Sequence, residues 1–524
     1  MEYENDYEPG TPEWAVREGL NVLLGDRPRL LKIERYVRGH HDKPYVPPDA
    51  TDEFQGIVDR SIINYMPLVL AGPTQTCFVD SIRHGAARLD FDMDPEEYDP
   101  QEDPALQLTP EMESWQQNRM DVRQTSFTRG LAQYGVVNAL TRLDKKGRVR
   151  YEAHSPQRSV CLFEDWINGY DPDYFLVVRQ GALDDGNPKL ISLFDQKLEY
   201  DIEYTDEDKI IIRDFWEHGN SECPGTRMAL QLDLEGRPLG LIEPLFEIQD
   251  QINQTNLDML VVQTYGSFKV KTVTGMAPPF ERWTPQLIDR VYPMLEPDDP
   301  DYERRLEERR GIQIGSPVTD SAGRRKALPV NISAKRVLFA EDKDAKWGTL
   351  DETPLEGYIA ALSEKVKHLF AISQTPSTYS VGEMANLSAE ALQAAEVAKR
   401  RRDDEIRMVL GEGYERMLRL GMELLGHEQA AEDQAAEIVW RDTDPHSRAA
   451  ISDALAKDVE ALEYPIFAAW EELPGMTQGR LMHVKRLWRQ QMESMPEAKQ
   501  AEAFDAVSRF SSVGGLSGAT STAA

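Results

Sequence analysis

The chain has 524 residues, of which 40% are hydrophobic and 29% are charged, so it is long enough for several cores and too apolar to be wholly disordered. Its formal net charge of -32 argues against a conventional DNA-binding domain, because such a domain needs a basic surface for the phosphates. It contains no apolar run of about 18 residues and begins with acidic residues, so we expect neither a membrane-spanning helix nor a secretory signal.

The chain carries no recognisable enzyme signature. Its three cysteines, Cys77, Cys161 and Cys223, lie far apart, so they predict neither a zinc site nor a disulfide framework and are expected to be core thiols. Neither a P-loop motif nor an HExxH motif is present, so P-loop nucleotide hydrolysis and zincin chemistry have no support. We therefore expect no catalytic residue, no metal and no cofactor.

The N-terminal part is predicted to be helical. Residues 1–12 form an acidic arm that we expect to be flexible. The pair Thr11-Pro12 has the pattern of an N-cap followed by a proline in the first turn, and the apolar residues after it recur at helical spacing. A second helix is expected over Thr51–Tyr65. A further continuous helix is expected over Thr109–Phe127, again with threonine and proline at its start.

From about Val136 the apolar period changes from helical to alternating. Val136–Leu143 and Arg148–Ala153 flank a polar turn and predict a β-hairpin. Further strands are expected where β-branched and aromatic residues recur, at Tyr174–Arg179, Leu190–Glu203 and Lys209–Phe215. The helical start is therefore followed by a β-rich region.

Two long helices with a module inserted between them are predicted after Pro244. Apolar residues trace a stripe through about twenty residues beyond this proline, which predicts the first helix. Lys269–Asp351 is rich in proline and contains a strand-like run at Val337–Phe339, so we expect a small mixed module without a long helix. The second helix is expected to begin at the capping box Thr353–Glu356.

A polar loop and a very long helix follow. The loop Ser373–Leu387 leads to a helix predicted over Ser388–Leu425. This helix exceeds the ordinary globular length, so it either kinks near Gly411–Gly413 or supports a large assembly. We expect a helical unit over Asp444–Phe510 and a disordered tail over Ser511–Ala524.

Three charged motifs each have two interpretations. Asp90, Asp92 and Asp94 alternate as in a calcium loop, but a proline stands where a glycine is required, so we expect an acidic solvated loop. The triplet His40–Asp42 suggests a metal site, yet adjacent histidines without a third ligand are typical of a protein surface. The basic run Lys399–Arg402 precedes three acidic residues, and either a DNA contact or a salt-bridged helix face fits it.

The order of these parts resembles that of the tailed-bacteriophage portal proteins, the head-to-tail connectors of the Gp6-like family. The most specific stretch is Leu369–Arg402, where a helix ends, a loop follows and a long helix begins. Pro244–Phe268 resembles the family's first stem helix entering the clip. Arg35–His41 resembles its aromatic and glycine-containing N-terminal segment.

The resemblance implies an α+β fold of the portal type, with long stem helices, a mixed α/β wing, a small inserted clip and a helical crown. The wing is expected to contain first helices and then strands. The parts are expected at residues 1–12 (flexible acidic arm), 13–237 (wing), 238–268 (first stem helix), 269–351 (clip), 352–372 (second stem helix), 373–387 (tunnel loop), 388–443 (long wing helix and connection), 444–510 (helical crown) and 511–524 (disordered tail).

The same resemblance implies a non-enzymatic structural subunit. Copies of the chain are expected to form a dodecameric ring at one capsid vertex, through which double-stranded DNA passes without sequence specificity during packaging and ejection. The expected partners are the terminase large subunit, the head-tail adaptor, the major capsid protein and the scaffolding protein, with no membrane. The expected location is the virion, after assembly in the host cytoplasm. A negatively charged channel suits this role because it repels the phosphates.

The resemblance assigns the DNA channel to the polar loop and to nearby cations. Two other classes remain open, namely another virion structural protein such as a tail scaffold, and a metal-dependent enzyme acting on nucleic acid. The residues expected at the channel are the loop residues Thr375, Pro376, Ser377, Thr378, Tyr379, Ser380, Val381, Gly382, Glu383, Met384 and Asn386 and the cations Lys269, Lys271, Lys365 and Lys367.

Overall fold

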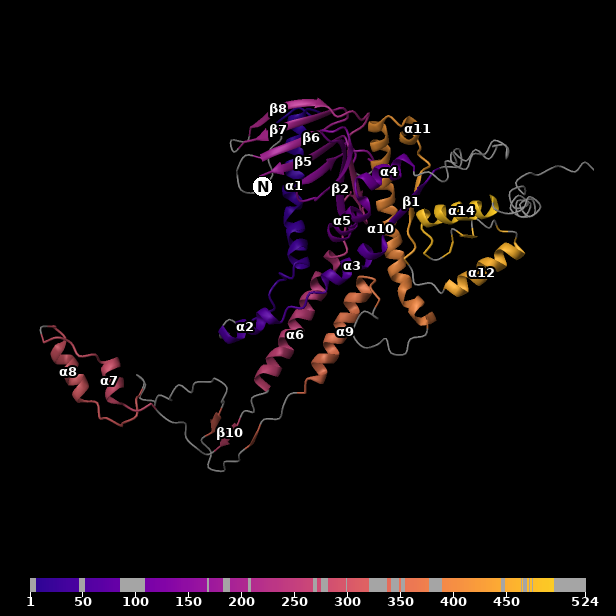
Figure 1. The fold of residues 1–524 in the computed structure, drawn as a ribbon. Helices are drawn as coiled ribbons and strands as arrows, with labels where there is room; N and C mark the ends of the chain where they lie inside the picture. Colours follow the sequence, from indigo (N-terminus) through magenta and orange to yellow (C-terminus); the bar gives the residue numbers. More distant parts are fainter. Residues whose placement is uncertain are drawn as a thin grey trace, which may run out of the picture. The chain divides into compact units, whose positions relative to one another are not determined.

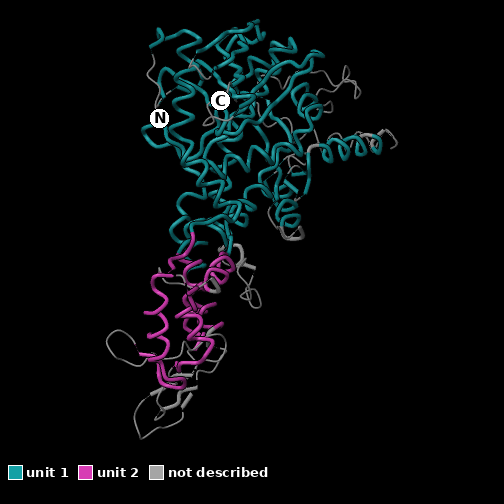
Figure 2. Tube along the Cα trace, turned by 90° about the vertical axis from the view of Figure 1, so that its left-hand side faces the viewer, with its two compact units in different colours: residues 1–42, 63–250, 365–524 teal, residues 43–62, 251–364 magenta. Residues whose placement is uncertain are grey.

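The described residues form a mixed α+β protein of two compact units, as the sequence predicts for the fold class (Figure 1). Unit 1 comprises residues 1–42, 63–250 and 365–524, and unit 2 comprises residues 43–62 and 251–364 (Figure 2). None of the helices described here combines the length and the apolar character needed to cross a membrane. The computed structural model describes residues 6–46, 52–84, 109–166, 169–181, 189–205, 209–266, 271–274, 281–297, 299–319, 337–340, 348–349, 354–376, 389–443, 448–462, 464, 469–470, 472–473 and 475–493.

Helix α1 (Pro12–Val37) begins where the sequence predicts. The Thr11 hydroxyl accepts a hydrogen bond from the Trp14 backbone N–H at 3.2 Å, and Pro12 occupies the first turn, where an N–H would have no helical acceptor. One side of α1 packs on a five-stranded antiparallel sheet of order β4-β5-β6-β7-β8. The strands are β4 (Ser159–Leu162), β5 (Tyr174–Gln180), β6 (Lys189–Phe194), β7 (Leu198–Tyr204) and β8 (Ile210–Glu217).

The expected strand run Leu190–Glu203 is two strands, β6 and β7, and not one. The Asp195 carboxylate accepts hydrogen bonds from the backbone N–H groups of Lys197 and Leu198, both at 2.7 Å. An aspartate that binds backbone N–H groups two and three residues later stabilises a tight turn. The chain therefore reverses at Asp195 although the apolar alternation continues on both sides.

A second sheet, of order β3-β2-β9, contains the predicted hairpin. Strands β2 (Val136–Leu143) and β3 (Val149–His154) pair antiparallel, and β9 (Gly225–Ala229) pairs on the other side of β2. The sheet is covered by α4 (Pro110–Gln117), α5 (Met120–Tyr134) and α10 (Ala389–Leu425).

The expected continuous helix over Thr109–Phe127 is broken between α4 and α5. Arg119 has a φ of 55°, in the left-handed region. The buried Asn118 amide donates hydrogen bonds to the Ser114 and Val149 carbonyls, both at 3.0 Å. Strand β3 therefore contributes one acceptor that ends α4, and helical periodicity carries no information about that contact.

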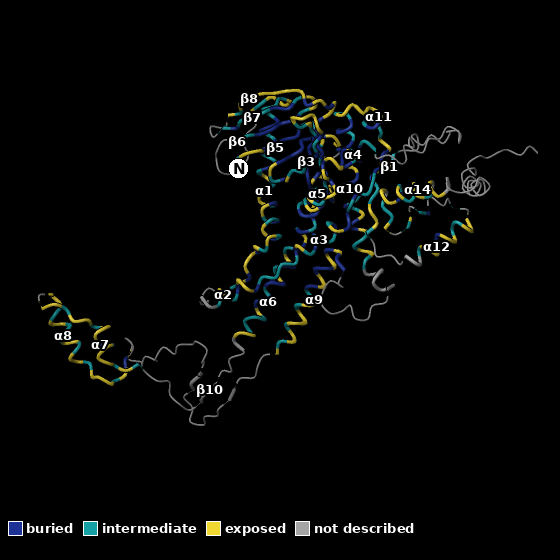
Figure 3. Tube along the Cα trace, viewed as in Figure 1, coloured by how far each residue is buried: buried dark blue, intermediate teal, exposed yellow. Residues whose placement is uncertain are grey.

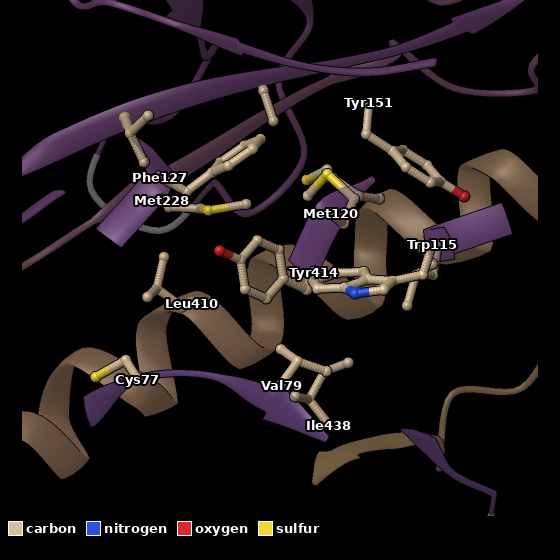
Figure 4. Packing of buried hydrophobic residues seen from close by; sticks show 14 of the residues in the cluster. Cys77, Val79, Trp115, Met120, Phe127, Tyr151, Met228, Leu410, Tyr414 and Ile438 are labelled. Atoms are coloured by element: carbon tan, nitrogen blue, oxygen red, sulfur yellow. The ribbon is translucent and has the colours of Figure 1, made fainter. Parts of the chain in front are cut away.

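One hydrophobic cluster of unit 1 is centred on Tyr414 of α10 (Figure 4). The Tyr414 ring meets the Trp115 and Phe127 rings edge-on, with centroids 5.3 Å and 5.6 Å away. Such edge contacts favour one arrangement of the rings beyond the free energy of burial. Figure 3 shows buried residues in this region and in the five-stranded sheet. All three cysteines are buried free thiols, as predicted.

Helix α10 runs for 37 residues and continues through Gly411–Gly413 without a break. Two of its glycines, Gly413 and Gly421, serve close packing. A Cβ at Gly413 would lie 2.4 Å from Met228 Cγ, and a Cβ at Gly421 would lie 2.4 Å from the Tyr151 hydroxyl. The absence of these two side chains lets the helix approach β9 and β3.

The remaining elements of unit 1 include an unexpected strand pair. Strand β1 (Val79–Arg83) pairs antiparallel with β13 (Glu437–Trp440), more than 350 residues later in the chain. Both strands are too short for a clear alternating pattern.

The other elements of unit 1 are α3 (Met66–Thr76), η3 (Glu243–Leu245), the start of α6 (Phe246–Gly266), the end of α9 (Glu356–Ile372), α11 (Glu428–Ala431), α12 (Arg448–Ala461) and α14 (Gln478–Glu493).

Unit 2 contains the rest of α6 and α9 and a small mixed module. The predicted helices after Pro244 and before Ser373 correspond to α6 and α9, and the expected strand at Val337–Phe339 is β11. Strand β10 pairs parallel with β11 and antiparallel with β12. The helices described in the module are short, as its prolines predict, and α8 has no buried residue (Figure 3). Its elements are β10 (Lys271–Thr274), α7 (Pro285–Val291), α8 (Tyr302–Arg310), β11 (Val337–Ala340) and β12 (Gly348–Thr349).

The expected helix Thr51–Tyr65 is shorter in the structure. Helix α2 (Asp52–Arg60) ends at Arg60. Within unit 1, the Tyr65 backbone N–H donates to Gln249 Oε1 at 3.3 Å, and Gln249 Nε2 donates to the Ile63 carbonyl at 2.7 Å. A side chain of α6 thus binds the backbone that would otherwise continue the helix.

Candidate functional site

The connector between α9 and α10 begins in a tight, buried turn. The Ser373 N–H donates to the Leu369 carbonyl at 2.9 Å, and the Thr375 N–H donates to the Phe370 carbonyl at 2.9 Å. Between them Gln374 adopts a φ of 51°. A residue in the left-handed region ends a helix by turning the chain back over its last carbonyls. The start of the connector therefore has a defined backbone.

Arg402 of α10 holds this turn. It donates from Nη1 to the Ser373 carbonyl at 2.7 Å and to the Thr375 hydroxyl at 3.4 Å. Its Nε and Nη2 donate to Asp403 Oδ1 at 3.2 Å and 3.0 Å. Both side chains of this ion pair are only 4% exposed. The guanidinium therefore links the end of α9 to α10 through charge-assisted hydrogen bonds, which are stronger than neutral ones.

The same cluster includes α3. The Thr76 hydroxyl donates to the second oxygen of Asp403 at 2.7 Å, so both carboxylate oxygens have a partner. Gly72 lies against the guanidinium, and a Cβ at this position would be 2.6 Å from Arg402 Nη2. We call Gly72, Thr76, Ser373, Thr375, Arg402 and Asp403 the Arg402 cluster. It joins three helices of unit 1 at the base of the connector.

A buried thiol borders the cluster. Cys77 Sγ lies 3.8 Å from the Asp403 carbonyl oxygen. Burial, followed by the nearby Asp403 charge, raises the pKa of Cys77 to about 11. A thiol with this pKa is protonated at neutral pH and acts as a packing group, not as a nucleophile.

The expected channel residues are distributed over described and undescribed parts of the chain. Thr375 and Pro376 are buried in the subunit, so they form the base of the connector. Lys271 lies on β10, whereas Lys365 is half-buried and Lys367 exposed on α9. Lys269 and the loop residues Ser377, Thr378, Tyr379, Ser380, Val381, Gly382, Glu383, Met384 and Asn386 lie outside the described residues.

The basic run Lys399–Arg402 does not behave as one surface. Arg401 is exposed, but Arg402 is buried and pairs with Asp403, so the expected salt bridge forms at Arg402 in the protein interior and not on a solvated helix face. The signal for its burial was present in the sequence. Arg402 lies four residues before Ile406 and eight before Leu410, both of which are buried on α10. A charged residue in register with an apolar stripe indicates a buried ion pair.

His41 is not a surface residue, contrary to the prediction. It is 5% exposed, its ring stacks on Tyr36 with centroids 4.8 Å apart, and its Nε2 lies 2.9 Å from the Tyr36 carbonyl oxygen. Burial lowers the pKa of His41. The described residues contain no group of three metal-ligating side chains, and the acidic alternation at Asp90–Asp94 lies outside them.

Comparison with known proteins identifies the family. A chain in the solved structure titled "Virion of native gene transfer agent (GTA) particle" is similar at 10% identity and a TM-score of 0.39, over 82% of this chain and 95% of that one. No curated protein matches the sequence. The family of phage portal proteins of the SPP1 Gp6-like type matches residues 21–503. This match spans most of the chain, so the protein belongs to the SPP1 Gp6-like family of phage portal proteins, a family of structural proteins of the virion.

Proposed function

We propose that the chain is the subunit of a dodecameric portal ring at one vertex of a phage capsid, and that DNA passes through this ring during packaging and ejection. The observation that carries the proposal is the family match over residues 21–503. It agrees with two long helices, α9 and α10, that are joined by a connector with a buried base. A ring requires each subunit to present two different faces to its neighbours, and long helices provide such faces.

In this proposal the parts of the chain have separate tasks. Residues 238–268 and 352–372 are the stem helices around the channel, and residues 373–387 are the tunnel loop. Residues 269–351 are the clip, which faces the terminase motor during filling and the head-tail adaptor afterwards. The wing comprises residues 13–237 and the long helix after the loop, and the crown comprises residues 444–510. Both parts meet the capsid and scaffolding proteins. Hydrolysis of ATP belongs to the motor.

The Arg402 cluster gives the tunnel loop a rigid base in this scheme. Arg402 holds the Ser373 carbonyl and the Thr375 hydroxyl at the start of the loop. A buried base restricts the conformations of the loop at one end. The remaining loop residues can then change conformation as the DNA moves past them. The net charge of -32 per subunit favours passage, because a basic bore would bind phosphates and slow the DNA.

Imaging of the purified chain tests the ring. Negative-stain electron microscopy and native mass spectrometry should detect closed rings with a central hole. A chain that stays monomeric at high concentration would contradict the proposal.

A loop variant tests the conduit. Deletion of residues 377–383 should leave ring formation intact and reduce packaged or retained DNA. The matched control replaces these seven residues with glycine and serine at equal length, which separates the loss of loop chemistry from the loss of loop length. Normal DNA retention by the deleted ring would favour another structural role in the virion.

A further inference from the structure

Unit 1 contains a cavity of about 580 Å³ among α1, β2, β4 and the segment after β9. This volume lies within the range of sites for small organic molecules. Its wall is largely apolar and includes Val22, Leu23, Val136, Val160, Pro238 and Leu239. The cavity lies apart from the Arg402 cluster, and the proposed portal function does not use it.

One cation in the wall has an unusual environment. Arg227 of β9 donates from Nη2 to the Gly236 carbonyl at 2.8 Å. Its guanidinium carbon lies 5.6 Å from the centroid of the Phe163 ring and 5.7 Å from that of Trp166. Burial lowers the pKa of Arg227, because the charged form loses hydration. Cation–π contacts recover only part of that loss.

The acidic side chains around the cavity already have partners. Arg29 binds Asp26 in a bidentate pair at 2.6 Å and 2.8 Å, and its Nη1 binds Glu243 at 2.5 Å. Asp233 accepts hydrogen bonds from two backbone N–H groups of its own turn, both at 2.9 Å. Glu235 pairs with Arg237.

The Asp26 carboxylate attracts Arg227 only through longer-range electrostatics, which do not outweigh the loss of hydration. Among the residues that the structure describes, no carboxylate forms an ion pair with it. A partly desolvated cation without an ion-pair partner is unfavourable, so an anion that enters the cavity gains an ion pair that the described residues do not form with Arg227.

We propose that this cavity binds a single carboxylate carried on an apolar or aromatic body, with Arg227 as the group that receives the carboxylate. The apolar wall accommodates the body of the ligand. A doubly charged anion such as phosphate fits less well, because the charges that line the cavity are already negative in sum. Four carboxylates stand against three guanidinium groups, namely Asp26, Asp233, Glu235 and Glu243 against Arg29, Arg227 and Arg237. A guanidinium binds a carboxylate through two parallel hydrogen bonds. The carboxylate comes either from a free small molecule or from an acidic side chain of a neighbouring subunit.

Benzoate tests this proposal, with benzyl alcohol as a neutral probe of similar shape. Saturation-transfer NMR on the full chain should detect benzoate binding with a dissociation constant of about 1 mM, and weaker binding of benzyl alcohol. Arg227→Gln should weaken benzoate binding about tenfold, since a hydrogen-bonded charge pair is lost, and leave benzyl alcohol binding within about twofold. The matched control is Arg237→Gln, at the same cavity but already paired with Glu235, which should leave benzoate binding unchanged.

Two further measurements complete the test. Arg227→Lys keeps the charge but loses the planar fork, so intermediate benzoate affinity with an unchanged circular dichroism spectrum separates recognition from misfolding. Binding to dissociated subunits but not to assembled rings would identify a neighbouring subunit as the source of the carboxylate, and binding to both would identify a small molecule. Equal affinity for benzoate and benzyl alcohol, or full benzoate affinity in a folded Arg227→Gln chain, would overturn the proposal. None of these readouts depends on DNA passage.

Discussion

Removal of the guanidinium from the Arg402 cluster should destabilise unit 1 strongly. Arg402→Met keeps most of the apolar stem but leaves Asp403 buried with Thr76 as its remaining side-chain partner, and leaves the Ser373 carbonyl without this donor. Both members of the ion pair are 4% exposed, so water does not replace the lost contacts. Breaking a buried ion pair on one side costs roughly 3–5 kcal/mol. We expect a loss of about 3 kcal/mol in the free energy of unfolding.

Two assays read this change. Urea unfolding followed by circular dichroism gives the loss of stability, and hydrogen exchange gives its location. The Ser373 and Thr375 amides are bonded to carbonyls at the end of α9, so they should exchange about tenfold faster or more in Arg402→Met. The double variant Arg402→Met with Asp403→Leu removes both charges and should recover part of the lost stability, because no unpaired charge stays buried.

Arg401→Met is the matched control, because Arg401 is the exposed neighbour on the same helix. Substitutions at such positions change stability by about 0.5 kcal/mol or less. Equal unfolding midpoints for Arg401→Met and Arg402→Met, with unchanged exchange at Ser373 and Thr375, would refute the role of the Arg402 cluster as the base of the connector.

Three further predictions concern packing, acid stability and thiol chemistry. Gly421→Ala places a Cβ 2.4 Å from the Tyr151 hydroxyl and should destabilise the protein by about 1–3 kcal/mol. Gly411→Ala, whose Cβ would have its nearest neighbouring atom at 3.9 Å, should be neutral or stabilising by up to about 1 kcal/mol. Thermal unfolding of both variants measures the difference. Burial raises the pKa of Glu152, but His154 and Arg142 outweigh it and lower the pKa from 4.5 to about 2. The contribution of Glu152 to stability is therefore complete above pH 4.5 and is lost as the pH falls to about 2, so Glu152→Gln should flatten acid unfolding in this window, and an unchanged slope would contradict the assignment. Burial raises the pKa of Cys77 to about 11 and that of Cys161 to about 12, so Ellman's reagent at pH 8 should detect no thiol in the folded chain and all three after denaturation.

Local patterns identified much of this molecule. The N-cap at Thr11, the hairpin after Val136, the first helix beyond Pro244 and the mixed module between the long helices all follow from short-range rules, and the structure contains each of them. These features depend on residues close in sequence, whose propensities and spacing the chain displays directly. The family resemblance carried by Leu369–Arg402 was confirmed for the same reason, because the order of elements is itself a property of the sequence.

The tertiary structure decided the features that join distant segments. Asn118 ends a predicted helix because β3 supplies an acceptor, and β1 pairs with β13 more than 350 residues away. Arg402 is buried because the ends of α9 and α3 converge on α10. They give the guanidinium and its carboxylate partner enough acceptors and donors. Periodicity determines which residues lie on one face, but the burial of a charge depends on partners that only the folded chain brings within hydrogen-bonding distance.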